Sequence, residues 1–552
     1  MKKMIKKMFF AALMFSAAAC SLMEEPTSFV NKHNFYKTAD QCYAALNVCY
    51  AHFNNIYVAN YMLATEGCTD LWYSESSAGD ASLDISPSKP QVGAQVWEQS
   101  YRGIKNCNEA IANIERSQLD ESVKGPLAAE GRVIRAMYYY ILTSMFDGVP
   151  FYTCMVDSYQ VQDSIRYLPR TPADTIRMTL YRDLRDNAIP HFTEENGLKV
   201  RGGEARNNRS GYAHGLMLMA KFAMWAQEWE MALAPLDSLE KLYGALTEER
   251  YPLEKTQWRY KNTEESIFEI QHEYSRDGIR YYSSVAPLMM PKYDRTADLF
   301  DGVYFENFTK TLPGWNGLKT NNHFAVFRPK SGLKEEEDPN QKSLFSPLPM
   351  TYDTENVTEN RYMTKLDLDA LETGLTKDGR KIDRRIAYVL GLGNLSTGDT
   401  FTITRKYGIA WAGPKFWCPD IENTYDSNNY RIFRYSDAVL MKAETLAQLN
   451  DPSCVNYLNQ VRARAGVDDY EFVGYPEFLQ FLRDERAREL GGEFMRKFDL
   501  VRWGIWYDET KKYIKGGKDK LVQPFHRYYP IPDKQCALSG YVLDNPEYKG
   551  QN

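Results

Sequence analysis

Apolar side chains recur every three or four residues through the first part of the chain, residues 31–245, and this spacing predicts successive α-helices. Between Ala94 and Arg116, five of them share one helical face: Trp97, Tyr101, Ile104, Ile111 and Ile114. A second stripe follows Pro126: Val133, Met137, Tyr140, Ile141 and Met145. We expect its helix to end at Asp147-Gly148-Val149-Pro150, because glycine accepts the left-handed cap conformation and proline cannot continue a helix.

A third helical hairpin is predicted after Ser210, which is a suitable N-cap residue. Its apolar positions are Leu216, Ala220 and Met224 in the first helix, and Trp229, Ala232, Leu236 and Leu239 in the second. Small residues recur in this hairpin, at Ala213, Ala220 and Ala232. We therefore expect the two helices to cross closely there.

The pattern changes in residues 246–430. Glycine and proline interrupt this region, for example at Pro313-Gly314 and Gly413-Pro414, and the short apolar run Ser266–Ile270 predicts a strand. The loops here are long, and long loops on a rigid scaffold tend to carry binding residues. We expect the ligand-binding part of the molecule in this region.

Helical periodicity returns in residues 431–552, where one stripe consists of Tyr435, Val439, Ala443 and Leu446. Asp451 as N-cap and Pro452 as first helical residue predict a partner helix that ends at Gly466. Such helix pairs resemble tetratricopeptide-type units, but the middle region separates them. The predicted fold is therefore mostly α. Helical hairpins pack against a loop-rich region with a few short strands, in a single body from residue 31 to 552.

Residues 1–19 have the order of a secretory signal peptide, with four lysines before an apolar stretch that ends in three alanines. That stretch is shorter than the ~20 residues a transmembrane helix needs, and no later segment reaches that length without charges. Cys20 follows directly and resembles the acylated cysteine of a bacterial lipobox, although Ala17 stands where leucine is usual. We expect lipid attachment at Cys20 and a tether over residues 20–30. A soluble periplasmic protein, cleaved after Ala19, is the alternative.

The composition of the chain argues against some classes of function and favours others. The 67 basic and 73 acidic residues leave a net charge of -6, with no basic run beyond the extreme N-terminus, so we expect no nucleic-acid partner. Aromatic residues make up 14%, and exposed rings suit the flat faces of sugars, although packing between helices is the alternative use of tyrosine. The histidines and cysteines lack metal-site spacing, so we expect no metal and no cofactor, and most cysteines to be buried as small apolar residues.

Two C-terminal segments strongly resemble the signature of the SusD/RagB family of outer-membrane nutrient-binding lipoproteins: Glu485-Arg486-Ala487-Arg488-Glu489-Leu490 and Arg496-Lys497-Phe498-Asp499-Leu500-Val501-Arg502-Trp503-Gly504. Other stretches are similar in the same order along the chain: Arg135–Tyr140, Phe146–Pro150, Arg434–Glu444, Leu458–Gly466, Tyr529–Pro532 and Asn545-Pro546. The resemblance implies a lipid-anchored protein on the outer-membrane surface. It would bind an oligosaccharide or another oligomeric nutrient and close over a SusC-like TonB-dependent transporter.

The charged residues of the signature alternate in sign, which predicts an ion-pair network between helices rather than a catalytic site. Glu485 and Glu489 could in principle form the acid and base of a glycoside hydrolase. Their arginine neighbours favour the ionised form, whereas a general acid must hold its proton at neutral pH. We therefore expect no catalytic residues.

Ligand-binding candidates come from aromatic and polar residues outside the helical stripes, because the resemblance carries no fixed ligand motif. They are Asp70, Trp72, Tyr73, Tyr281, Tyr282, Tyr304, Trp315, Arg405 and Trp411. Trp72 and Trp315 lead this group because neither fits a helical stripe, whereas Trp97 and Trp503 are assigned to packing. Three functions stay open: glycan binding and delivery without catalysis, a surface glycoside hydrolase, and a peptide-binding or scaffold lipoprotein.

Overall fold

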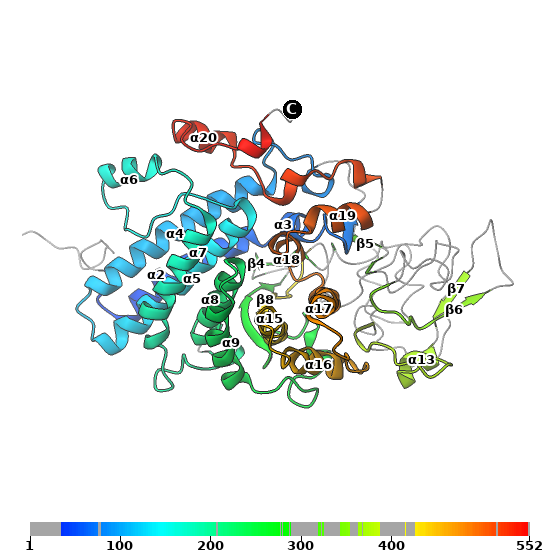
Figure 1. Cartoon of the computed structure of the whole chain (residues 1–552). Coiled ribbons are helices and arrows are strands. Elements are labelled where there is room, and N and C mark those ends of the chain that lie inside the picture. Colours follow the sequence, from blue (N-terminus) through cyan, green and yellow to red (C-terminus); the bar gives the residue numbers. More distant parts are fainter. Residues whose placement is uncertain are drawn as a thin grey trace, which may run out of the picture.

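The computed structural model describes residues 35–74, 79–205, 208–275, 278, 280–285, 288, 318–321, 323–324, 343–353, 363–366, 368–386, 415, 425–514 and 517–549. Helices dominate this part of the chain (Figure 1). They are α2 (Ala39–Ile56), α3 (Ala59–Thr65), α4 (Val92–Arg116), α5 (Glu121–Phe146), α6 (Tyr159–Arg166), α7 (Ala173–Asn187), α8 (Tyr212–Trp225), α9 (Trp229–Tyr243), α13 (Leu368–Thr373), α15 (Tyr435–Gln448), α16 (Cys454–Ala465), α17 (Tyr475–Leu490), α18 (Arg496–Arg502), α19 (Trp506–Tyr513) and α20 (Asp533–Leu538).

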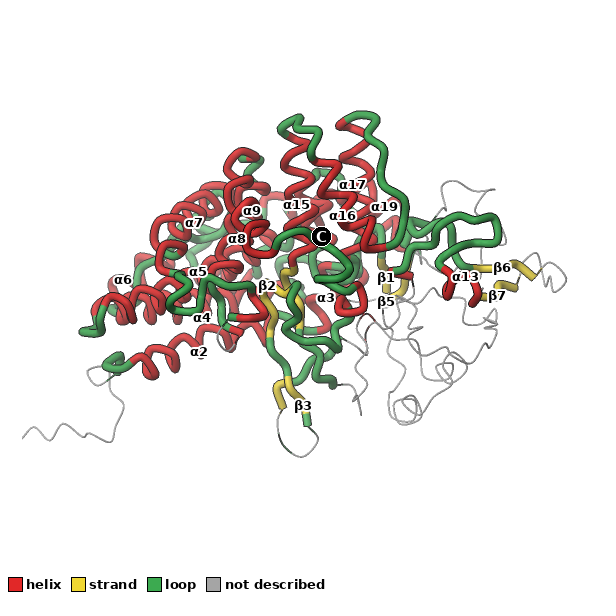
Figure 2. The backbone as a smooth tube through the Cα atoms, turned by 90° about the horizontal axis from the view of Figure 1, so that it is seen from below, coloured by secondary structure: helices red, strands yellow, loops and turns green. Residues whose placement is uncertain are grey.

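The helices form a continuous layer of hairpins. α4 packs on α2 and α5, α7 lies between α5 and α8, and α8 pairs with α9. α15 then packs on α9 and carries α16 and α17, so the C-terminal helices extend the layer that the N-terminal helices begin (Figure 2). The mostly helical fold that the sequence predicts is confirmed.

The strands of the described residues form two-stranded antiparallel pairs: β1 (Trp72–Ser74) with β5 (Leu318–Thr320), β2 (Ser266–Ile270) with β8 (Tyr430–Arg434), β3 (Glu273–Tyr274) with β4 (Arg280–Tyr281), and β6 (Met350–Asp353) with β7 (Met363–Leu366). β2 matches the predicted strand. It runs beside β8 from the Ser266–Arg434 pair to the Ile270–Tyr430 pair, and both strands are buried. The chain therefore enters and leaves the middle region at adjacent positions.

The predicted stripe of α4 is buried at Trp97, Ile104, Ile111 and Ile114. α5 begins before Pro126, which lies inside its second turn and removes only the hydrogen bond to the Ser122 carbonyl. It ends where expected, but Asp147 takes the positive φ, 63°. Gly148 is required for another reason, because a Cβ there would lie 2.8 Å from the Thr171 carbonyl oxygen.

Two cap predictions are wrong. Gly211, not Ser210, is the N-cap of α8, and the buried Ser210 hydroxyl lies 2.8 Å from His214 Nδ1 instead. Ser453, not Asp451, is the N-cap of α16, while Asp451 accepts a hydrogen bond from the Ser453 amide at 2.9 Å. The predicted end of α16 is confirmed, since Gly466 has the left-handed φ of 73°.

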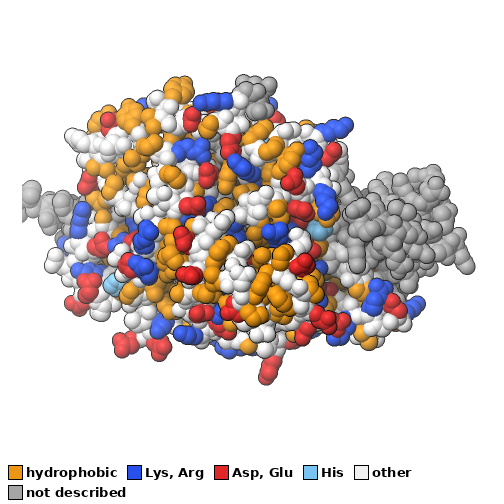
Figure 3. Space-filling view, in the orientation of Figure 1, with side chains coloured by type: hydrophobic (Ala, Val, Ile, Leu, Met, Phe, Trp, Pro, Cys, Tyr) orange, Lys and Arg blue, Asp and Glu red, His pale blue; other side chains and the backbone are white. Residues whose placement is uncertain are grey.

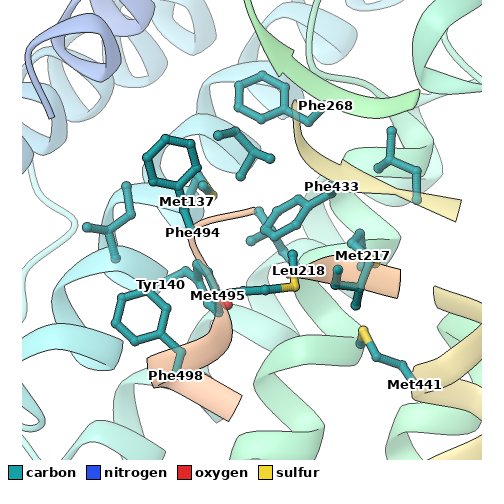
Figure 4. Packing of buried hydrophobic residues seen from close by; sticks show 14 of the residues in the cluster. Met137, Tyr140, Met217, Leu218, Phe268, Phe433, Met441, Phe494, Met495 and Phe498 are labelled. Atoms are coloured by element: carbon teal, nitrogen blue, oxygen red, sulfur yellow. The ribbon is translucent and has the colours of Figure 1, made fainter. Parts of the chain in front are cut away.

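A single hydrophobic core joins the helical layer to the β2–β8 pair. Met137 and Tyr140 of α5, Met217 and Leu218 of α8, Phe268 of β2 and Phe433 of β8 meet there, together with Phe494, Met495 and Phe498 (Figure 4). The described cysteines are buried apart from the exposed Cys154, which confirms the expectation for most of them. Among the described residues, no helix has both the length and the apolar character needed to cross a bilayer.

Candidate functional site

Three tyrosine rings from two distant segments meet beside the β3–β4 hairpin, and a fourth tyrosine, the exposed Tyr281, lies in β4 of the same hairpin. Tyr274 and Tyr281 belong to the hairpin, Tyr282 follows it, and Tyr425 precedes β8 in sequence. The rings of Tyr282 and Tyr425 are 3.9 Å apart at 36°, and Tyr274 contacts both, with centroid distances of 6.4 Å and 5.8 Å. We call these four residues the tyrosine cluster. Figure 2 shows its hairpin projecting from the helical body beyond β2.

The tyrosine cluster stands on a hydrogen-bonded extension of the β2–β8 pair. Ser283 and Asp426 exchange backbone hydrogen bonds of 2.9 and 3.0 Å. The Tyr274 amide donates to Ser427 Oγ at 3.1 Å, and the His272 amide donates to Asn429 Oδ1 at 2.9 Å. These bonds fix the two segments relative to each other, so the rings are held before any ligand arrives.

The tyrosine cluster offers apolar faces and hydroxyl groups to solvent. Tyr281 is 68% exposed, Tyr282 44% and Tyr425 37%. Partial burial and the neighbouring Tyr425 raise the pKa of Tyr282 above its ordinary value, so its hydroxyl stays protonated and can donate a hydrogen bond. The exposed Glu273 is paired with Tyr281 across the hairpin and adds a carboxylate acceptor. Rings beside polar groups can bind a ligand that has apolar faces and hydroxyl edges.

The structure exposes both Tyr281 and Tyr282, on opposite faces of the extended segment that leaves the hairpin, but gives three other candidates a different role. Asp70 and Trp72 are 0% and 1% exposed, and Tyr73 is buried as well. Trp72 pairs with Thr320 in the β1–β5 ladder and packs on Phe324, with ring centroids 5.0 Å apart. A ring enclosed in this way offers no face to a ligand. The interpretation of these three residues as a binding surface is therefore replaced by a packing role.

The buried carboxylate of Asp70 is stabilised by an ion pair. Arg496 of α18 donates to both of its carboxylate oxygens, at 2.9 and 2.6 Å. Burial alone would raise the pKa of Asp70, but Arg496 outweighs that effect and holds the pKa below its ordinary value. Asp70 thus joins the segment before β1 to the C-terminal signature.

The remaining candidates, Tyr304, Trp315, Arg405 and Trp411, lie outside the described residues, as do Cys20, the predicted signal peptide and the tether. Sequence reasoning missed Tyr274 and Tyr425. Tyr425 was detectable in principle, because it stands in the polar run Asn423–Asn429 without apolar neighbours to cover its ring. Tyr274 carried no such signal, since only the chain reversal after β3 brings it beside Tyr425.

The charged signature forms a buried ion-pair network, as predicted. Arg434 Nη1 lies 2.7 Å from both Glu265 and Glu489, and its Nε lies 2.9 Å from Glu493. Arg385 reaches Glu485 at 2.7 Å and Glu489 at 3.0 Å. The network joins β8, α16 and α17 to the residue before β2 and to the middle region.

The network excludes Glu485 and Glu489 as a general acid and base. Burial would raise their pKa values, but Arg385, Arg488 and Arg462 lower the pKa of Glu485 to about 2. Arg464, Arg434 and Arg385 act on Glu489 in the same direction, so its pKa is also far below the ordinary value. Both carboxylates are ionised at neutral pH, shielded from solvent and already occupied by guanidinium groups.

The surface shows no concentration of one charge sign on the face seen in Figure 3, where acidic and basic side chains are interspersed. Within the described ranges, no three histidine, cysteine, aspartate or glutamate side chains come together as metal ligands.

The sequence model of the SusD family matches residues 419–548, which include Tyr425, β8 and the charged signature. A SusD-like protein of Formosa agariphila is 24% identical over 565 residues, covering 97% of this chain and 96% of that protein. The chain is similar to SusD-like proteins over nearly its whole length. Starch-binding protein SusD of Bacteroides thetaiotaomicron is 30% identical over 132 residues, which is 23% of each chain.

Solved structures of SusD-like proteins share the fold. A SusD-like protein from Bacteroides fragilis has a TM-score of 0.64 at 18% identity, covering 95% of this chain and 100% of that one. Surface glycan-binding protein A from Bacteroides thetaiotaomicron, solved in complex with laminarihexaose, has a TM-score of 0.60 at 17% identity, covering 91% and 98%. The likeness spans the helical layer and the middle region together, so the chain has the architecture of whole SusD-like proteins.

Proposed function

We propose that this chain is a cell-surface protein that binds oligosaccharides at the tyrosine cluster and does not cleave them. The observation that carries the proposal is the exposure of Tyr282 and Tyr425 in one ring contact, with the exposed Tyr281 on the adjoining strand. A platform of aromatic rings with a few hydrogen-bonding groups suits sugar capture and needs no activated nucleophile. The starch-binding relative and the structural neighbour solved with laminarihexaose support an oligosaccharide as the ligand class.

Binding without turnover also agrees with the charged signature. Glycoside hydrolysis needs one protonated and one ionised carboxyl group on either side of the scissile bond. Glu485 and Glu489 are both ionised and enclosed by arginines, so this pair gives the hydrolase alternative no support.

Titration calorimetry of the purified mature protein tests the proposal, with a panel of starch, laminarin and other soluble glycans, and with oligopeptides for the peptide alternative. We expect saturable binding of at least one glycan, and no new reducing ends after prolonged incubation. The Tyr281→Ala/Tyr282→Ala double variant should lose most of this affinity. Tyr541→Ala, which removes another exposed ring at 75% exposure, should keep it. Release of shorter products, or equal binding by the double variant, would overturn the proposal.

We further propose that the protein is acylated at Cys20, is displayed on the outer membrane, and delivers its ligand to a SusC-like TonB-dependent transporter. The lipobox-like sequence and the similarity to SusD-like proteins support this arrangement. Affinity purification from detergent-solubilised outer membranes should recover a large TonB-dependent transporter with the tagged chain. Recovery of the chain without such a transporter, after mild cross-linking of intact cells, would contradict the partnership.

A further inference from the structure

A cavity of about 480 Å³ lies among α4, α5 and α7, bordered by the segment that joins α5 to α6. Its size falls within the ~300–1,000 Å³ range of small-molecule sites. None of the residues that line it belongs to the tyrosine cluster or to the ion-pair network of the signature. The cavity is therefore a separate feature that the proposed function does not use.

Two buried side chains in the cavity wall have hydrogen-bond donors without a partner in the described part of the chain. They are Arg135 and Asn108, which are 2% and 1% exposed. Arg135 uses its Nη1 to bond Asn108 Oδ1 at 2.9 Å and its Nη2 to bond Asp183 at 2.6 Å, which leaves Nε unpaired. Asn108 Oδ1 must face the guanidinium, so the unpaired Nδ2 is a donor. A buried donor without a partner is destabilising, so a ligand oxygen that reaches either atom recovers a lost hydrogen bond.

The same wall supplies acceptors and an apolar surface. The Asp183 carboxylate is 19% exposed, and the half-buried Phe151 ring also lines the cavity. The lining side chains carry balanced charge: Arg116, Arg132 and Arg135 against Glu115, Asp157 and Asp183. A balanced lining gives no preference for an anion or a cation. Donors next to a carboxylate acceptor instead match hydroxyl groups, each of which both accepts and donates a hydrogen bond.

We propose that this cavity is a second binding site for a compact, neutral, polyhydroxylated ligand of one or two sugar units. The hydroxyl groups accept from Arg132 and donate to Asp183, whose side chains are 17% and 19% exposed, while Phe151 covers an apolar face of the ligand. Arg135 Nε and Asn108 Nδ2 join these contacts once the ligand displaces the side chains that cover them. A free sugar and the end of a longer glycan share this chemistry. The inference does not depend on the tyrosine cluster, because the two sites have no residue in common.

Cys154 provides a local reporter, because it lines the cavity and is exposed. The test measures alkylation of Cys154 by iodoacetamide in the full mature protein, quantified on its peptide by mass spectrometry. The probes are glucose, galactose and mannose, their disaccharides, and a reduced hexasaccharide, with sodium acetate as the anionic comparison. A sugar at ten times its dissociation constant should slow the reaction about tenfold. Protection by the small sugars identifies a free-sugar site, and protection by the hexasaccharide alone identifies a chain-end site.

Two variants separate this site from the tyrosine cluster. Ala112→Trp fills the cavity from α4 and should abolish protection, and Thr179→Trp does the same from α7 if the first variant folds poorly. The Tyr281→Ala/Tyr282→Ala variant should keep full protection, even though it loses binding at the tyrosine cluster. No protection by any sugar, protection by acetate alone, or protection that persists in both tryptophan variants would each overturn the inference.

Discussion

Replacing Tyr281 by alanine should weaken glycan binding by an amount that its exposure sets. The side chain is 68% exposed, and a tyrosine buries about 200 Å² when it is fully covered, so about 135 Å² is accessible. A sugar that covers one face removes roughly half of this area from water, about 70 Å². At about 25 cal/mol per Å², the lost contact is worth about 1.7 kcal/mol, which weakens the dissociation constant roughly 20-fold.

The same reasoning gives a smaller effect for Tyr282, because its exposure is 44%. About 45 Å² of covered surface corresponds to about 1.1 kcal/mol, or roughly a sixfold loss of affinity. Tyr281→Phe keeps the ring and should bind within about threefold of the parent, since it loses one solvent-exposed hydrogen bond. Isothermal titration with the best-binding glycan measures all three variants. If Tyr281→Ala binds as tightly as the parent, or if Tyr282→Ala is the weaker binder of the two, the assignment of the platform is incorrect.

Four further outcomes follow from the structure. Arg434→Met should lower the free energy of unfolding by about 3–5 kcal/mol, because it leaves buried carboxylates with fewer cations. Arg527→Met, at an exposed pair, should lower the free energy of unfolding by less than about 1 kcal/mol. Urea titration of both variants measures the difference. Glu265 and Glu485 have folded pKa values of about 2, below the unfolded value of ~4.3. Their contribution to the stability of the folded protein is therefore complete above about pH 5 and is lost as the pH falls toward 2. Melting temperatures measured across that pH range should show this loss. Trp72→Phe should lower the melting temperature and leave glycan affinity unchanged, and a loss of affinity at intact stability would restore Trp72 to the binding surface. Cys20→Ala should move the protein from the membrane to the soluble fraction, unless the mature chain is not lipid-anchored.

The helical part of the fold could be predicted from the sequence because its information is local. A stripe such as Trp97, Ile104 and Ile111 identifies both the helix and its buried face without reference to any other segment. The caps were predicted less well. Ser210 bonds a histidine on the following turn rather than a backbone amide, and only the three-dimensional position of α8 decides between these partners.

The binding surface could be predicted only in part, because burial of its candidates depends on contacts between distant segments. Trp72 fits no helical stripe, which suggested exposure, yet a strand pair with Leu318–Thr320 encloses it. Tyr281 and Tyr282 are exposed as expected, but Tyr425 completes the cluster from more than a hundred residues away. The network shows the same limit. Its helical members were recognised, whereas Arg385 lies in the loop-rich region and gave no signal.

The pairing of Ile270 with Tyr430 brings the two ends of the middle region together at the helical frame. A segment that leaves and rejoins its host at neighbouring residues can be exchanged, lengthened or shortened without moving the host's helices. Natural or engineered chimaeras could therefore transplant residues 271–429 as one cassette to change what the surface recognises. Such a cassette must still carry a strand equivalent to Leu318–Thr320, which covers the recipient's Trp72, and a guanidinium equivalent to Arg385, which pairs with its Glu485 and Glu489.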